Sequence, residues 1–293
     1  MKKVILINVS KKDFQYSNIK KYEKKFKIIF SEDKKNFEKK NVIAILAGLE
    51  KFTKKEIDNY PNLKIISRFG TGVDNVDLDY AKKKKVLVLK TRQEPVLPTA
   101  ELTVALILMI TRKLFQNVTS LKNKKWLQFK GRNLKSKKVG IIGFGLIGRS
   151  VANILDKFGC EIHFCDKKKI KYKNYKQVNI SKIFKYSDII CLHLNFTQDQ
   201  ENFISKKILN LMKKNCILIN TARGSFINED DLFLHLKKNK NFTAVSDCFK
   251  KEPYIGKLLN LKNFFGTSHV SSNTYESRIA MSKKSFLNII EKI

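Results

Sequence analysis

The stretch VGIIGFGLIG, residues 139–148, decides the fold of this chain. It opens with an apolar run typical of a buried strand, and apolar residues then recur at helical spacing over residues 146–158. The glycines therefore fall on a turn from strand to helix. Gly143 permits the tight turn, Gly145 lets a pyrophosphate approach the backbone, and Gly148 lets the helix pack closely on the strand. The free N–H groups at such a helix N-terminus favour the phosphates of a dinucleotide.

The residues after this turn agree with a dinucleotide site. A second expected strand, residues 161–165, ends in Asp166, where an acid that binds the ribose belongs. Lys167, Lys168 and Lys169 follow and could tolerate a 2′-phosphate, but the carboxylate of Asp166 would repel one at short range. NAD is therefore favoured over NADP. From the local sequence alone, a glycine turn in another kind of α/β protein stays the alternative.

The composition is that of a globular protein with a substantial core. The chain has 293 residues, of which 43% are hydrophobic, enough for one large or two ordinary domains. The net charge of +34 would ordinarily indicate a nucleic acid or an anionic membrane as partner. Of the 60 basic residues, however, only seven are arginine, the residue preferred for bidentate phosphate contacts. Because lysines are scattered through nearly every segment, we favour a solvated lysine surface over specific binding of nucleic acid.

The spacing of cysteine and histidine gives no indication of a metal site. The five cysteines form no CxxC pair, and three of them lie in apolar strand-like runs, so we interpret them as buried and unpaired. The longest apolar run, residues 102–110, is too short to span a bilayer, and the apolar segment near the N-terminus is too brief for a signal peptide. We therefore expect a cytoplasmic protein with no membrane association and no metal.

Two series of alternating strands and helices are expected. The strands of the first series are residues 4–9, 27–30, 42–47, 64–69 and 86–89, and those of the second are residues 139–143, 161–165, 188–194, 216–220, 243–247 and 263–267. Nearly continuous apolar strands that alternate with helices are typical of a parallel sheet covered on both faces. The sequence therefore predicts an α/β fold with two doubly wound parallel-sheet domains.

Three further helices are expected outside this alternation. Residues 97–111 form a long apolar helix with Pro98 in its first turn, and residues 114–126 extend as a second arm. Residues 272–293 form an amphipathic helix, whose predicted apolar face contains Ile279, Phe286, Leu287 and Ile290. This last helix has no sheet of its own, so it must pack on one of the two domains.

A dinucleotide domain implies hydride transfer, which at a carbonyl needs a cation that holds the substrate and an acid that delivers a proton. Arg223 follows an expected strand, so it stands at the carboxyl edge of the sheet, where ligands bind in such folds. Asn228 caps the next helix and so places Arg223 in the turn before it. Asp247, Glu252 and His269 follow the next two strands and would face the same crevice. Taken singly, each of these residues could also be an ordinary surface or loop residue.

Six motifs follow one another over almost the whole chain: RFGTGVDNVDL, AELTVALIL, GFGLIG, INTARG, SDCFKKEP and TSHVSSNT. Together they resemble the NAD-dependent D-2-hydroxyacid dehydrogenases, and most closely the phosphoglycerate dehydrogenase branch of that family. The resemblance implies a flavodoxin-like substrate domain formed by residues 1–97 and 270–293. A Rossmann NAD-binding domain, residues 98–269, would be inserted into it.

The resemblance also implies the roles of the site residues. Arg223 binds the carboxylate and carbonyl of the substrate, His269 is the general acid and base, and Glu252 hydrogen-bonds His269. A carboxylate beside an imidazole favours the protonated ring, which could then donate a proton near neutral pH. The implied cofactor-binding residues are Gly143, Gly145, Leu146, Ile147, Gly148, Asp166, His193, Thr221, Ala222 and Asp247, the last at the nicotinamide end. The backbone of Gly70, Thr71 and Gly72 would face the substrate.

Several positions depart from the family pattern. The segment His193-Leu194-Asn195-Phe196-Thr197 replaces the usual HxPLT, and Leu146 stands where an arginine is common. The loop of residues 90–98 lacks the usual Asn-Gly composition and carries Arg92. We hypothesise that Arg92 or Arg68 recognises a phosphate or second carboxylate distal to the reacting carbonyl, since the planar fork of arginine suits both. The alternative is that Arg92 only pairs with Glu94 at the surface.

These inferences predict an enzyme that interconverts a D-2-hydroxyacid and its 2-keto acid with NAD(H), in a cleft between two domains that close over the substrate. The arm at residues 114–126 suggests a homodimer, because family members pair through the dinucleotide domain. With no sequence after Ile293, feedback through a C-terminal regulatory domain is not expected. A glyoxylate or hydroxypyruvate reductase is the alternative enzyme, and a non-catalytic dinucleotide-sensing binding protein is the alternative class.

Overall fold

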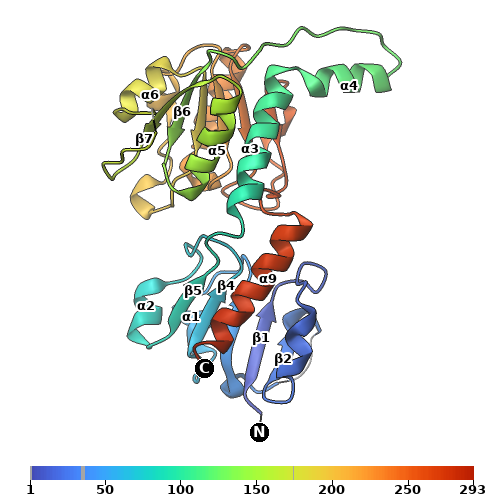
Figure 1. Ribbon diagram of the computed structural model, residues 1–293, viewed down its shortest axis with the longest axis vertical. Helices are drawn as coiled ribbons and strands as arrows, with labels where there is room; N and C mark the ends of the chain where they lie inside the picture. Colours follow the sequence, from blue (N-terminus) through green and yellow to red (C-terminus); the bar gives the residue numbers. More distant parts are fainter. Residues whose placement is uncertain (1, 34–36, 174) are drawn as a thin grey trace. The chain divides into compact units, whose positions relative to one another are not determined.

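The computed structural model describes residues 2–33, 37–173 and 175–293 (Figure 1). The chain divides into two compact units. One unit comprises Met1–Pro95 and Ser272–Ile293, and the other comprises Val96–Ser271, so along the sequence the second unit interrupts the first. Each unit is built around its own parallel sheet, which confirms the predicted α/β fold with two doubly wound sheets.

The sheet of the first unit has the strand order β2-β1-β3-β4-β5, and every neighbouring pair is parallel. Its strands are β1 (Val4–Asn8), β2 (Lys27–Phe30), β3 (Val42–Ala47), β4 (Ile65–Arg68) and β5 (Leu87–Lys90). This is the flavodoxin-like order, in which the winding reverses between β1 and β3. The helices α1 (Lys54–Asp58) and α2 (Leu78–Lys83) contribute to the core on one face, and α9 (Tyr275–Ile290) contributes to the core on the other.

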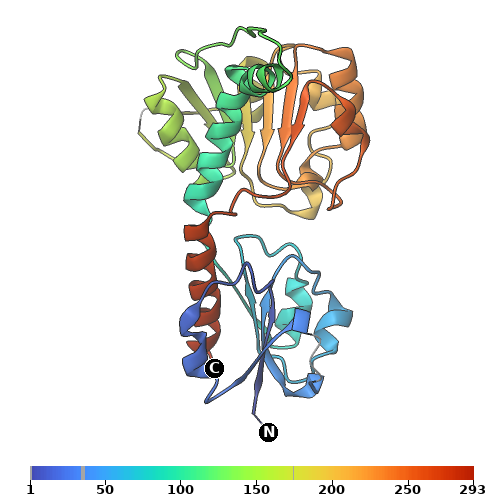
Figure 2. The ribbon, with the colours of Figure 1, turned by 90° about the vertical axis from the view of Figure 1, so that its right-hand side faces the viewer.

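The helix α9 packs on this sheet through a face that hydropathy alone does not reveal (Figure 2). Its buried side chains include Ser282 and Ser285, whose hydroxyls donate to carbonyls one turn earlier in the helix. Phe286 is fully buried as predicted, but Ile279 is 49% exposed, so its predicted place on the apolar face is wrong. Serines that satisfy their own hydroxyls take that face instead, because their small side chains let the helix approach the sheet closely.

The sheet of the second unit has the order β12-β11-β10-β9-β6-β7-β8, again with every pair parallel. Its strands are β6 (Lys138–Ile142), β7 (Glu161–Cys165), β8 (Lys176–Gln177), β9 (Ile189–Leu192), β10 (Ile217–Asn220), β11 (Thr243–Ser246) and β12 (Phe264–Gly266). The chain enters at β6, winds outward through β7 and β8, and crosses back to β9. The winding therefore reverses between β6 and β9, as in the Rossmann fold. The strand β8 is absent from the sequence-based prediction, because two residues carry no periodicity.

Helices cover both faces of the second sheet. The helices α3 (Val96–Thr111) and α5 (Leu146–Lys157) lie side by side over one face (Figure 1). The helices α6 (Ile180–Tyr186), α7 (Lys206–Leu209) and α8 (Glu229–Lys238) contribute to the core on the other face. Short 3-10 helices occur at Ser17–Tyr22, Ser31–Asp33, Lys39–Asn41, Gln198–Gln200, Gly224–Phe226 and Lys257–Asn260. Within the described residues, no helix combines the length and the apolar character that crossing a membrane requires.

The helix α4 (Leu114–Lys122) follows α3 and extends away from the second sheet (Figure 1). It ends at Lys122 and not at residue 126 as predicted, because Lys124 adopts the left-handed conformation with a φ of 57°. The side chain of Asn117 then exchanges two hydrogen bonds with the backbone of Phe129. These bonds fold the segment after α4 back along the helix.

Candidate active site

The turn between β6 and α5 contains three glycines. Gly143 and Gly148 have no room for a side chain, whereas Gly145 faces open space. Gly143 has a φ of +90°, and a Cβ atom there would lie 2.5 Å from the carbonyl oxygen of His193. A Cβ on Gly148 would lie 2.3 Å from the carbonyl oxygen of Gly143. A Cβ on Gly145, by contrast, would meet nothing within 4 Å. The turn therefore leaves room in front of the α5 N-terminus, where free N–H groups favour a phosphate.

The carboxylate of Asp166, which follows β7, is tied to this turn. One oxygen accepts the backbone N–H of Phe144 at 2.8 Å, and the other accepts that of Lys168 at 3.0 Å. A carboxylate has about four acceptor positions, so it can still accept hydroxyl groups of a ribose. The side chain of Leu146 is 46% exposed at the start of α5, whereas Ile147 packs against the core beside α3.

His193 follows β9, on the other side of the point where the winding of the second sheet reverses. Burial lowers the pKa of His193 to about 4, so its ring is neutral at physiological pH. In the part of the chain that the structure describes, its Nε2 atom is buried without a hydrogen-bond partner. Buried polar atoms normally have a partner. The backbone of His193 lies against Gly143, and its unsatisfied ring nitrogen is suited to a polar group of a bound dinucleotide.

The turn after β10 carries Arg223 and is held by the buried side chain of Asn220. The Oδ1 atom of Asn220 accepts the backbone N–H of Ala222 at 3.1 Å, and its Nδ2 atom donates to the carbonyl of Arg223 at 2.8 Å. The Arg223 guanidinium donates to the carbonyl of Ala222 at 2.7 Å. The hydroxyl of Thr221 lies 3.0 Å from that of Thr103 on α3. The turn is therefore anchored before any ligand binds.

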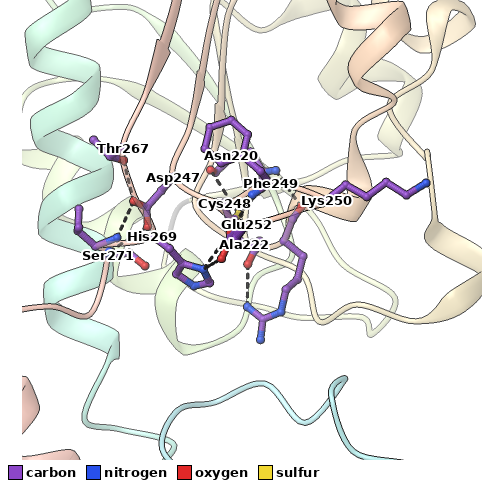
Figure 3. A network of polar contacts seen from close by, with 12 residues as sticks. Asn220, Ala222, Asp247, Cys248, Phe249, Lys250, Glu252, Thr267, His269 and Ser271 are labelled. Atoms are coloured by element: carbon purple, nitrogen blue, oxygen red, sulfur yellow. Dashed lines mark hydrogen bonds and ion pairs between the residues drawn. The ribbon is translucent and has the colours of Figure 1, made fainter. Parts of the chain in front are cut away.

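His269 and Glu252 face each other directly (Figure 3). The Nδ1 atom of His269 lies 2.9 Å and 3.1 Å from the two carboxylate oxygens. Burial opposes ionisation of Glu252, but hydrogen bonds from His269 and from the N–H of Phe249, together with the charges of His269 and Arg223, outweigh it and lower the pKa of Glu252. An ionised carboxylate only accepts hydrogen bonds. Nδ1 therefore carries the proton in this pair, and Nε2 is left for proton exchange with a ligand.

Asp247 anchors the loop that presents His269 (Figure 3). Its carboxylate is 1% exposed and accepts the hydroxyl of Thr267 at 2.6 Å and the backbone N–H groups of Val270 and Ser271 at 2.8 and 2.9 Å. These three donors flank His269, whose φ of +56° lies in the left-handed region. The contact of Asp247 with the nicotinamide stays a prediction, and the structure adds this anchoring role.

The substrate-binding candidates of the first unit follow β4 and β5. Gly70 has a φ of +148°, and its carbonyl accepts the N–H of Thr91 at 3.2 Å. Arg68 is only 3% exposed and donates to the carbonyls of Ala47 and Gly72 at 2.7 and 3.1 Å. Its side chain therefore shapes the loop formed by Gly70, Thr71 and Gly72.

Arg92 is exposed, and among the described residues it forms no ion pair with Glu94. The Glu94 carboxylate accepts the backbone N–H of Gln93 instead. Of the two arginines considered for a distal acidic group, Arg92 is thus the exposed one. Its role, like those of Gly70, Thr71 and Gly72, stays a prediction.

Asn220, Gly224 and Thr267 are site residues that the sequence-based assignment misses. Asn220 could have been found from the sequence, because it is a polar residue at the end of an apolar strand. Thr267 could not, because its partner Asp247 follows a different strand. Gly224 is more hidden: a Cβ there would lie 1.9 Å from the carbonyl carbon of Phe249. That contact brings the turn of Arg223 onto the loop of Glu252. In the described residues, no group of three His, Cys, Asp or Glu side chains could hold a metal ion.

Comparison with known proteins places this geometry in a family. Residues 104–271 match the family described as "D-isomer specific 2-hydroxyacid dehydrogenase, NAD binding domain". The chain is 34% identical over 258 residues to a hydroxypyruvate reductase of Thermotoga maritima, a match covering 86% of this chain and 83% of that protein. It is 35% identical over 248 residues to a D-3-phosphoglycerate dehydrogenase of Methanocaldococcus jannaschii, covering 82% of this chain but 47% of that protein. A D-lactate dehydrogenase structure from Aquifex aeolicus, complexed with NAD and lactic acid, superposes with a TM-score of 0.86 at 25% identity, covering 98% of this chain and 94% of that one.

Proposed function

The chain belongs to the D-isomer specific 2-hydroxyacid dehydrogenases, and we propose that it uses NADH to reduce a short 2-keto acid to the corresponding D-2-hydroxyacid. Membership makes it an oxidoreductase that acts on CH–OH groups with NAD(H) as cofactor. The single observation that carries the finer proposal is the His269–Glu252 pair near the charge of Arg223. All three residues follow carboxyl ends of strands in the sheet whose β6 leads into the glycine turn.

In the proposed mechanism, the Arg223 guanidinium binds the substrate carboxylate and polarises the adjacent carbonyl. A dinucleotide held at the glycine turn and by Asp166 would supply the hydride that the carbonyl carbon accepts. His269 donates its Nε2 proton to the carbonyl oxygen, so that the C=O bond becomes a CH–OH group. Glu252 stabilises the protonated ring before transfer and keeps it oriented afterwards. In the oxidative direction, the neutral Nε2 atom accepts the hydroxyl proton.

A short keto acid such as hydroxypyruvate or glyoxylate is favoured over a phosphorylated one. The hydroxypyruvate reductase relative matches along most of its length, whereas the phosphoglycerate dehydrogenase relative matches along less than half. The buried side chain of Arg68 donates to backbone carbonyls, so the exposed Arg92 is the arginine that would bind a distal phosphate. 3-Phosphohydroxypyruvate remains the second candidate, because the identity to the phosphoglycerate dehydrogenase relative is equally high.

The test is NADH oxidation, followed by absorbance, with glyoxylate, hydroxypyruvate, pyruvate and 3-phosphohydroxypyruvate, repeated with NADPH. We expect the highest kcat/KM with an unphosphorylated substrate and NADH. A preference for 3-phosphohydroxypyruvate that Arg92→Ala abolishes would favour the second candidate. Absence of turnover with every substrate, despite tight NADH binding, would favour a dinucleotide-sensing protein without catalysis.

We also propose that the protein is a homodimer formed through α4. Leu114, Phe115, Val118 and Leu121 are between 48% and 60% exposed on this helix, and Trp126 after it is 80% exposed. Apolar residues grouped on one extended helix are typical of an interaction surface. A second copy is the occupant that fits, because a two-fold axis pairs the same apolar surface with itself.

The five cysteines are free, which supports a reducing, cytoplasmic location.

A further inference from the structure

We infer that Asn220 and Gly224 are positioning residues, which set where the Arg223 guanidinium lies relative to the His269–Glu252 pair. This inference rests on the proposed role of Arg223 in binding the substrate carboxylate. Neither side chain is expected to touch the substrate, since Asn220 is fully buried and Gly224 has no side chain. Both act through the backbone that flanks Arg223.

Asn220 fixes the conformation of the turn from the sheet side. It is the last residue of β10, and its backbone is held in the ladder beside β9 and β11. Its side chain, fixed by that ladder, accepts from the N–H of Ala222 and donates to the carbonyl of Arg223. The peptide group before Ala222 and the peptide group after Arg223 are thereby tied to a single buried side chain. The Arg223 backbone is extended, with φ −145° and ψ 137°.

Gly224 fixes the turn from the opposite side, against the loop after β11. A Cβ at this position would lie 1.9 and 2.3 Å from the carbonyl carbon and Cα of Phe249, and 2.4 Å from the nitrogen of Lys250. All three are backbone atoms, so a side chain cannot be accommodated by a rotamer change. The same Phe249 donates its N–H to the Glu252 carboxylate at 2.9 Å.

These contacts form one continuous connection from Arg223 to His269. Asn220 and Gly224 hold the turn, Phe249 holds Glu252, and Glu252 holds His269. The positive charge of Arg223 helps to stabilise the ionised carboxylate of Glu252. If the contact of Asn220 or of Gly224 were lost, the Arg223 guanidinium would move away from His269. Every group that reacts would still be present.

The primary variants are Asn220→Ala and Asn220→Asp. The aspartate keeps the acceptor for Ala222 but loses the donor to the Arg223 carbonyl. Asn263→Ala is the matched control, because the side-chain amide of Asn263 also donates to backbone carbonyls, three of them, but immediately before β12 and away from the turn. We expect kcat/KM for the keto acid to fall about 100-fold in both Asn220 variants. The control should lower Tm only.

A double-mutant cycle separates positioning from general damage. If Asn220 acts through Arg223, Asn220→Ala should cost less than about threefold in kcat/KM in an Arg223→Lys background, because the placement it protects is already lost. A full 100-fold loss in that background would overturn the inference. If Asn220→Ala does not fold, Asn220→Asp takes its place in the cycle.

A crystal structure of the Asn220 variant decides the question independently of turnover. We expect the turn of residues 221–224 to shift and the contact between the Arg223 guanidinium and the Ala222 carbonyl to open. A turn that superposes on the wild-type turn would refute the positioning role, whether or not the enzyme is active. Failure of the wild-type protein to reduce any keto acid would instead reject the proposed function, so the two failures are distinct.

Discussion

The Nδ1 atom of His269 lies 2.9 Å from one carboxylate oxygen of Glu252 and 3.1 Å from the other, so a single ring nitrogen faces both oxygens. The pair joins the loops after β11 and β12, and each loop has its own anchor. Phe249 holds Glu252, and Asp247 holds the segment around His269. The orientation of the proton donor therefore depends on the segment after β11, which holds Glu252 through Phe249 and holds the loop of His269 through Asp247.

Glu252→Gln is expected to remove a pH-dependent part of the free energy of unfolding. The pKa of Glu252 is lowered in the folded state, so above its ordinary value of 4.5 the ionised carboxylate stabilises the fold. That contribution is lost as the pH falls through the lowered folded-state pKa. Urea unfolding between pH 7 and pH 3 should show wild type more stable than the variant at neutral pH and the two converging in acid. A difference that is constant over this range would contradict the ion pair.

His269→Ala is expected to lower kcat by about 10²–10⁴-fold, the usual contribution of a positioned general acid. The affinity for NADH, measured by calorimetry, should stay within about twofold of wild type, because His269 is not part of the glycine turn. His163→Ala is the control, since His163 lies on β7 next to Glu161 and should leave kcat unchanged. Equal losses in both variants would remove His269 from the mechanism.

Asp247→Ala should destabilise the protein by more than about 2 kcal/mol, because three donors lose their acceptor in a buried place. Thr267→Val removes only one of these donors and should cost about 1 kcal/mol. Urea unfolding without cofactor measures both. A loss of NADH affinity in Asp247→Asn beyond its loss of stability would support the predicted contact with the nicotinamide. Unchanged affinity would restrict Asp247 to anchoring.

Gly145→Ala is expected to weaken NADH binding, whereas Gly148→Ala is expected to lower the stability of the fold. A methyl group on Gly145 meets nothing, so Tm without cofactor should be nearly unchanged, whereas Kd for NADH should rise about tenfold because the methyl occupies the approach of the phosphates. A methyl on Gly148 lies 2.3 Å from a backbone oxygen, so Tm should fall even without cofactor. Thermal unfolding and calorimetry distinguish the two. Unaltered NADH affinity in Gly145→Ala would place the phosphates elsewhere.

Leu121→Glu in α4 should convert the proposed homodimer to a monomer, because it places a charge in the apolar surface that a second copy would cover. Sedimentation equilibrium gives the mass directly. Leu234→Glu on α8, where the side chain is equally exposed, is the control and should leave the mass unchanged. A monomeric wild-type protein would refute the proposal.

Much of the fold was predictable because its signals are local. The apolar run and glycines of residues 139–148 specify strand, turn and helix without help from distant residues, and the remaining strands are continuous apolar segments. Two helix predictions are less accurate, one because buried serines bond within their own helix and one because of a left-handed backbone. Ser282 and Ser285 conceal the buried face of α9, and the left-handed Lys124 ends α4 early. Hydropathy does not record either effect.

The sequence by itself determined the chemistry available, since Arg223, Glu252 and His269 stand after strands whose parallel ends share one edge. Only the tertiary structure decided how these groups are held. The close approach that excludes a side chain at Gly224 and the three donors to Asp247 join segments that are distant in sequence. Such contacts depend on distances between backbones, and those distances exist only once the sheet has formed.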